Sequence, residues 1–167
     1  NVTKTLQDRE VGEGGNNQVM GGEEFTFRVR YDVQEGTYTN VVLSDAVRTG
    51  ANLTDYEILS ASIVTWDPLI NTSTNASVDV GFAGTVASDG NSVSFDLGTF
   101  ENLSDQNASN DFIEIEVVAQ SLPTDTAMPP DPVEAGDRLS NQARFASDSA
   151  TVTDNATVRV IEPSLLI

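Results

Sequence analysis

The 167-residue chain contains no cysteine and no histidine. Disulfides, thiol nucleophiles, most zinc and transition-metal sites and all chemistry that depends on an imidazole are therefore excluded. No apolar run approaches the roughly 18 residues of a membrane span. Residues 1–10 have neither the basic start nor the apolar stretch of a signal peptide. The sequence predicts a segment that makes no membrane contact itself.

Positive charge is also scarce. Lysine and arginine total 8 against 26 aspartates and glutamates, which gives a formal charge of −18. Nucleic acids and anionic lipids bind through basic side chains that neutralise phosphate, so both are excluded as partners. The only lysine in the chain is Lys4. An acidic, lysine-poor composition explains why lysine is rare but not why it stands at position 4.

Apolar and polar residues alternate with a period of two along most of the chain, which is typical of β-strands with one buried face. The clearest case is residues 24–33, where Phe25 and Phe27 alternate with Thr26 and Arg28. The complete set of expected strands covers residues 2–6, 24–33, 39–47, 56–66, 78–86, 92–97, 112–119, 139–146 and 152–161. Polar or proline-rich segments at 67–77, 101–111 and 122–137 predict long surface loops. About nine strands in one domain predict an all-β sandwich.

The end of the chain predicts a repeat. Residues 162–167 continue an apolar pattern directly after the last expected strand, and an isolated strand needs a partner. We therefore expect one domain at 1–161, followed at 162–167 by a linker and the start of a following repeat in a tandem array. The alternative is a final strand that folds back on this same domain.

Three polar residues lie in phase with apolar neighbours and are expected to face the core. Lys4 lies on the same face of its strand as Val2 and Leu6. Asp45 lies on the apolar face of strand 39–47, and Asn141 lies on the apolar face of strand 139–146. Each has an ordinary explanation: a lysine at a strand end, an aspartate closing a turn, an asparagine bonding nearby backbone. Together they indicate chemistry.

Burial disfavours charge, so it lowers the pKa of a lysine and raises that of an aspartate. A neutral Lys4 amine held against the Asn141 side chain can attack the amide carbon, while protonated Asp45 polarises the carbonyl and shuttles protons. Ammonia then leaves and an isopeptide crosslink remains. Such crosslinking happens once per molecule, so no enzymatic turnover and no cofactor are expected.

The same residues carry a resemblance to a known family. The chain resembles the isopeptide-forming, Ig-like repeat domains of bacterial and archaeal surface proteins and fimbriae, of the collagen-adhesin A type. The matching segments span nearly the whole chain and are Val-Thr-Lys4, Gly22-Glu-Glu-Phe-Thr-Phe-Arg-Val-Arg-Tyr31, Val41-Val-Leu-Ser-Asp45 and Leu139-Ser-Asn-Gln-Ala143.

The resemblance implies that Lys4 is the donor, Asn141 the acceptor and Asp45 the catalytic acid. The segment after Asp45 departs from the family pattern, because it reads Ala-Val-Arg-Thr-Gly50 where relatives often have a Thr-Leu-Pro-like run. Some family members use a glutamate as the acid, but Glu114 and Glu116 are expected on the outward face, which favours Asp45. The implied function is a structural repeat of an extracellular adhesin, fimbria or fibre, with neighbouring repeats of the same polypeptide as partners.

Three alternatives stay open. A calcium site near the expected loops would use Asp148, Asp154, Asp131 and Asp137, but no Asp-x-Asp-x-Asp-Gly loop is present, and a solvated acidic face is the favoured account of these residues. A carbohydrate-binding module would use Trp66, Tyr56 and Tyr38 as a stacking platform. A glycosidase would need two carboxylates across one cleft, and no pair here can be brought together from the pattern.

Overall fold

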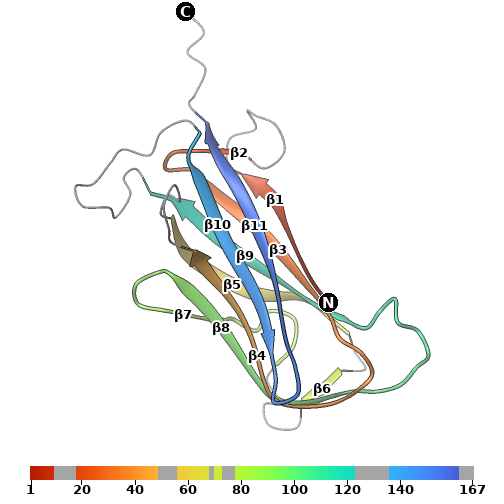
Figure 1. The fold of residues 1–167 in the computed structure, drawn as a ribbon. Helices are drawn as coiled ribbons and strands as arrows, with labels where there is room; N and C mark the ends of the chain where they lie inside the picture. Colours follow the sequence, from red (N-terminus) through yellow and green to blue (C-terminus); the bar gives the residue numbers. More distant parts are fainter. Residues whose placement is uncertain (10–17, 49–55, 68–69, 73–77, 123–135, 162–167) are drawn as a thin grey trace, which may run out of the picture.

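The chain folds into two facing β-sheets without a helix in its described part (Figure 1). The computed structural model describes residues 1–9, 18–48, 56–67, 70–72, 78–122 and 136–161. These contain the strands β1 (Val2–Arg9), β2 (Gln18–Met20), β3 (Glu24–Asp32), β4 (Gly36–Arg48), β5 (Tyr56–Trp66), β6 (Ile70–Thr72), β7 (Thr85–Val86), β8 (Ser92–Asn102), β9 (Phe112–Ser121), β10 (Arg138–Ala146) and β11 (Thr151–Ile161).

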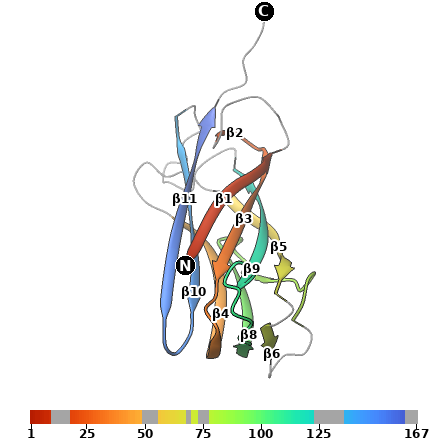
Figure 2. The same cartoon turned by 90° about the vertical axis from the view of Figure 1, so that its right-hand side faces the viewer.

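The two sheets pack face to face as an Ig-like β-sandwich, which confirms the predicted fold class (Figure 2). The first sheet has the order β1-β3-β9-β5. The second has the order β2-β11-β10-β4-β8-β6, with β7 on β8. Pairing is antiparallel except between β2 and β11. The first strand and the last two strands therefore belong to different sheets.

The core lies between the sheets and is made by every second residue of the long strands. In β3, Phe25, Phe27, Val29 and Tyr31 are buried, while the residues between them are only partly covered. The strand β9 repeats this pattern over its whole length. Because side chains of a strand point alternately to opposite faces, one strand supplies both core and surface.

The prediction of a strand at 78–86 is wrong for most of that segment, because only Thr85–Val86 is a strand. Gly81 has a φ of +89°, and Gly81 and Gly84 donate backbone hydrogen bonds to β5 in the first sheet. The chain then joins β8 in the second sheet at Thr85. This segment crosses between sheets, so its alternating apolar residues do not share one strand, and Val80 is 59% exposed.

The strands β2 and β6 were not expected, and β6 lies inside the predicted loop 67–77. Each has three residues, which is too short for a recognisable period. Residues 162–167, for which a linker and a further repeat were predicted, lie outside the described residues. No helix of the described residues is long and apolar enough to span a membrane.

Candidate functional site in the core

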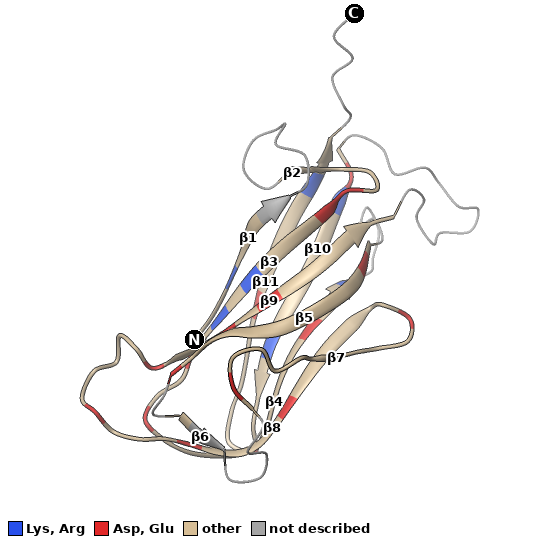
Figure 3. Ribbon diagram, turned by 180° about the vertical axis from the view of Figure 1, so that it is seen from behind, with Lys and Arg blue, Asp and Glu red and all other residues tan. Residues whose placement is uncertain are grey.

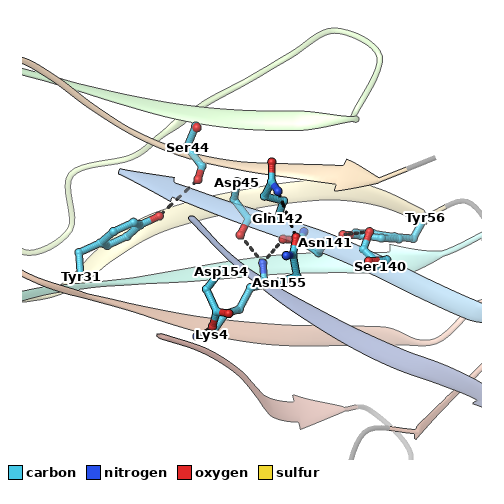
Figure 4. Close-up of polar contacts among 10 residues, drawn as sticks. All are labelled: Lys4, Tyr31, Ser44, Asp45, Tyr56, Ser140, Asn141, Gln142, Asp154 and Asn155. Atoms are coloured by element: carbon cyan, nitrogen blue, oxygen red, sulfur yellow. Dashed lines mark hydrogen bonds and ion pairs between the residues drawn. The ribbon is translucent and has the colours of Figure 1, made fainter. Parts of the chain in front are cut away.

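Lys4, Asp45 and Asn141 meet between the two sheets (Figure 4). Lys4 comes from β1 in the first sheet, and the other two come from β4 and β10 in the second. Lys4 is 6% exposed, and Asp45 and Asn141 are fully buried. The Lys4 Nζ donates hydrogen bonds to Asp45 Oδ2 and to Asn141 Oδ1. The structure thus brings together all three residues that the sequence placed on core faces.

The register of the second sheet places the acid beside the carboxamide. On β10, Ala143 lies opposite Asp45, and Asn141 is two residues away on the same face. Side chains in such diagonal positions on neighbouring strands come within reach of each other. Lys4 enters from the facing sheet, where it lies opposite Val29 on β3.

The surroundings of the Lys4 amine are apolar and aromatic. Its Nζ lies 4.1 Å from the centre of the Phe27 ring. The buried tyrosines nearby direct their hydroxyls to the backbone, with Tyr31 donating to the Ser44 carbonyl at 3.3 Å and Tyr56 to the Ser140 carbonyl at 3.4 Å. A site of this kind holds little that can solvate a charge.

Burial acts on both titrating partners in the direction of neutrality. It lowers the pKa of Lys4 to about 8, although the carboxylates of Asp45 and Asp154 offset part of this effect. Burial also raises the pKa of Asp45, and the adjacent Lys4 offsets part of that rise. The proton of this pair is therefore shared more evenly than between an exposed lysine and aspartate.

Two polar atoms of the site make no hydrogen bond with the described residues: Asp45 Oδ1 and Asn141 Nδ2. Buried polar atoms of native proteins are nearly always bonded, so each such atom needs an explanation. Here the unbonded nitrogen is the one that would leave the carboxamide as ammonia. The unbonded oxygen belongs to the neighbouring carboxyl group that would carry protons.

A fourth polar residue, Asp154 on β11, contacts β1. Its Oδ2 accepts a hydrogen bond from the backbone N–H of Lys4 at 3.0 Å. Our sequence reasoning considered Asp154 only as a calcium ligand and missed this contact. The signal was available, because Asp154 is in phase with the buried Val158 and Val160 of the same strand.

The glutamates considered as alternative acids belong to β9 in the first sheet (Figure 3), where they alternate with the buried residues and therefore point to the outer face. Glu116 pairs with Arg28 at 2.9 Å, and Glu114 accepts a hydrogen bond from Thr65 at 2.8 Å. Neither reaches the Lys4 amine, so Asp45 is the carboxyl group at this site.

The residues proposed for calcium are engaged separately. Asp148 binds the side chains of Thr39 and Asn40, Asp154 binds the Lys4 backbone, and Asp131 lies outside the described residues. No group of three or more acidic side chains suited to a metal ion occurs within the ranges that the structure describes.

The three aromatic residues considered for carbohydrate stacking do not form an exposed platform. Tyr56 is 1% exposed and packs against Phe25. Trp66 packs against the core and donates its indole N–H to the Ile70 carbonyl at 2.9 Å, and Tyr38 packs against the Phe100 ring. These contacts assign all three a structural role.

Comparison with known proteins gives structural likeness only. No family model matches the chain, and no curated protein sequence matches it. Similar solved structures include BcpA, the major pilin subunit of Bacillus cereus, at 12% identity and a TM-score of 0.42, over 96% of this chain and 40% of that one. A three-domain backbone pilin of Streptococcus pyogenes gives 14% identity and a TM-score of 0.48, over 95% of this chain and 35% of that one.

The collagen binding subdomain of the Enterococcus faecalis surface protein ACE is 10% identical, with a TM-score of 0.36, and 96% of each chain is covered. The chain thus spans well under half the length of the two pilins and nearly all of the adhesin subdomain. Likenesses at these scores carry no argument about function.

Proposed function

We propose that this chain is a structural repeat of an extracellular adhesin, fimbria or fibre, stabilised by an isopeptide bond that Lys4 forms with Asn141 with the help of Asp45. The observation that carries the proposal is the contact of the only lysine in the chain with a buried carboxamide and a buried carboxyl group. A lysine amine, an acceptor amide and a proton carrier are the three groups that such a bond requires.

The reaction begins with proton transfer from the Lys4 ammonium to Asp45, which leaves a neutral amine. The Lys4 nitrogen then attacks Cγ of Asn141, and Asp45 donates its proton to the developing oxyanion. As the tetrahedral intermediate collapses, the bond between Cγ and Nδ2 breaks, and protons relayed by Asp45 convert the leaving nitrogen to ammonia. One amide replaces another, and no oxidant or cofactor is consumed.

The proton balance agrees with the surroundings of Asp45. The starting ion pair holds one proton more than the amide and ammonia can carry away, so Asp45 ends the reaction protonated. Burial raises the pKa of Asp45, which favours that neutral carboxylic acid once the charge of the Lys4 amine has been lost.

The bond suits a structural domain of an extracellular fibre. It would join the first strand to the strand before the last, across the two sheets, and enclose 137 positions of the chain. An amide is insensitive to redox conditions, which fits a chain without cysteine. Each molecule reacts once, so the domain has no turnover, and its partners are neighbouring repeats of the same polypeptide at the cell surface.

Intact mass spectrometry of the purified protein and of an Asp45→Ala variant tests the proposal. We expect the wild type to be lighter than its sequence mass by one ammonia and the Asp45→Ala variant to have its full mass. The matched control is Asp96→Ala, which removes an exposed carboxylate from β8 of the same sheet and should leave the loss of ammonia intact. A wild-type protein of full sequence mass would refute the crosslink.

A further inference from the structure

The strands β1 and β11 lie side by side where the two sheets meet (Figure 2). β1 is the outer strand of its sheet and pairs only with β3. At the level of Asp154, β11 has only β10 as a partner, because β2 joins it farther along, at Arg159. Edge strands carry backbone N–H and C=O groups without ladder partners. The residues that hydrogen-bond to these backbone groups therefore help to fix the position of β1 relative to the second sheet.

One of these groups is the backbone N–H of Lys4. It points away from β3 and donates to the Asp154 carboxylate at 3.0 Å. Apart from the bonds of the Lys4 amine itself, this is the one hydrogen bond that joins residues 2–7 of β1 to the second sheet in the part of the chain that the structure describes. A hydrogen bond to a charged acceptor is stronger than one between neutral groups.

Asp154 and the acceptor Asn141 belong to the same pair of strands. Asp154 lies opposite Ala143 on β10, two residues from Asn141. Asp154 therefore ties the backbone of the donor residue to the strands that present the acceptor. A shift of β1 by one residue would turn Lys4 outward, and a shift by two would move it about 7 Å along the strand.

We propose that Asp154 is a positioning residue for the crosslink, because its carboxylate holds the Lys4 backbone in the register that brings Nζ to Asn141. This inference rests on the proposed crosslinking function. Asp154 acts on Asn141 only through the placement of Lys4, because its hydrogen bond goes to the Lys4 backbone.

The charge of Asp154 opposes the reaction, whereas its hydrogen bond to the Lys4 backbone favours it. Its negative charge raises the pKa of Lys4, and so does that of Asp45 on β4, whereas the Phe27 ring on β3 and the Asn141 amide on β10 are neutral. A raised pKa means less neutral amine. Two substitutions separate the effects, since Asp154→Asn keeps an acceptor oxygen without the charge and Asp154→Ala removes both.

The experiment follows the bond as it forms. Full-length chains are recovered in urea, where intact mass confirms that no ammonia has been lost, and are then diluted into buffer. Circular dichroism reports folding, and mass spectrometry reports the loss of ammonia over time. We expect Asp154→Ala to fold but to react about tenfold more slowly than the wild type, from the loss of one charge-assisted hydrogen bond. Asp154→Asn should react at least as fast as the wild type, and the control Asp96→Ala should match it.

A second readout tests the contact without the reaction. In an Asn141→Ala background, which cannot crosslink, Asp154→Ala should speed hydrogen exchange at the Lys4 amide about tenfold, while Asp154→Asn should preserve its protection. The Thr5 amide, which faces β3 by the alternation of antiparallel pairs, should stay protected in both variants.

The outcomes separate this inference from the proposed function. If the wild type never loses ammonia, the crosslink and the positioning role are both overturned. If the wild type loses ammonia and Asp154→Ala reacts at the same rate, or if Asp154→Asn is slowed as much as Asp154→Ala, only the positioning role is overturned.

Discussion

Removing the crosslink without leaving a charge in the core should lower the free energy of unfolding by about 5 kcal/mol. The variant is the double substitution Lys4→Met with Asp45→Asn. A bond between Lys4 and Asn141 closes a loop of 137 positions, and the chain-entropy relation gives about 5 kcal/mol for a loop of that length. Methionine keeps the length and apolar stem of Lys4, and an asparagine at position 45 can hydrogen-bond the Asn141 carboxamide.

The double substitution is needed because a single one would mix two effects. Lys4→Met alone removes the bond, but it leaves the fully buried Asp45 beside a side chain that supplies neither a positive charge nor the N–H of the crosslink amide. A buried carboxyl group without such a partner is costly at pH 7, whereas neutral side chains of similar size at both positions are often nearly neutral. We therefore expect Lys4→Met to be less stable than the double variant at pH 7, and the difference to shrink at low pH, where Asp45 is protonated.

Urea unfolding, followed by the fluorescence of the single tryptophan, measures the effect. Trp66 is packed against the core and reports its loss. With a slope of about 2 kcal/mol per molar urea, a loss of about 5 kcal/mol lowers the midpoint by about 2–3 M. If the double variant unfolds with a free energy within about 1 kcal/mol of that of the wild type, the reasoning is refuted, because the crosslink would then make no chain-entropy contribution to stability.

Two further predictions concern acidity and packing. The rate of ammonia loss during refolding should have a bell-shaped pH dependence, because the reaction needs one proton shared between Lys4 and Asp45. Below the raised pKa of Asp45 the Lys4 amine stays charged, and above the Lys4 pKa of about 8 the pair has lost the proton that Asp45 must donate. A rate that keeps rising to pH 10 would contradict this. Gly84→Ala should lower the free energy of unfolding by about 1–3 kcal/mol in urea, because its Cβ would lie 2.6 Å from Val93 Cγ2. The control is Gly21→Ala, whose Cβ meets nothing within 4 Å. If the two variants are equally stable, Val93 can move away and the prediction is wrong.

The long strands could be predicted from the sequence because each buries one face along its whole length. β5 begins and ends where the alternation of residues 56–66 predicts. The short strands could not be predicted, because β2 and β6 have three residues each and owe their structure to partners far away in the chain. The prediction of a strand at 78–86 was wrong, because the alternation of apolar residues does not reveal that the chain crosses from one sheet to the other near Gly81 and Gly84.

For the candidate site, too, the orientation of each residue could be predicted from its own strand, but the contacts between strands could not. Period-two alternation indicated that Lys4, Asp45 and Asn141 face inward, which is a property of each strand alone. Their meeting depends on which strands of the two sheets face each other, which alternation does not reveal; it was a hypothesis from the chemistry of the three side chains, and the family resemblance supported it. The alternation of β11 also placed Asp154 in phase with buried residues, but its partner, the Lys4 backbone N–H, could not be predicted, because that contact depends on how two sheet edges lie beside one another.

The placement of Lys4 and Asn141 also sets how far the domain can extend when its ends are pulled. With the bond in place, the covalent path from the first residue crosses at Lys4 to Asn141 and then follows β10 and β11 to the exit at Ile161. All strands from β2 to β9 lie off this path and bear no tension along their backbones. Only the β10–β11 hairpin can be pulled out, and its roughly 20 residues from Asn141 to Ile161 have an extended length of about 70 Å at ~3.4 Å per residue. Because Asn141 pairs with Ala156, five residues before Ile161, the two residues already lie about 17 Å apart in the folded hairpin, so the gain in length is about 50 Å. Such a domain would lengthen by one short, defined step and keep the rest of its core folded under load.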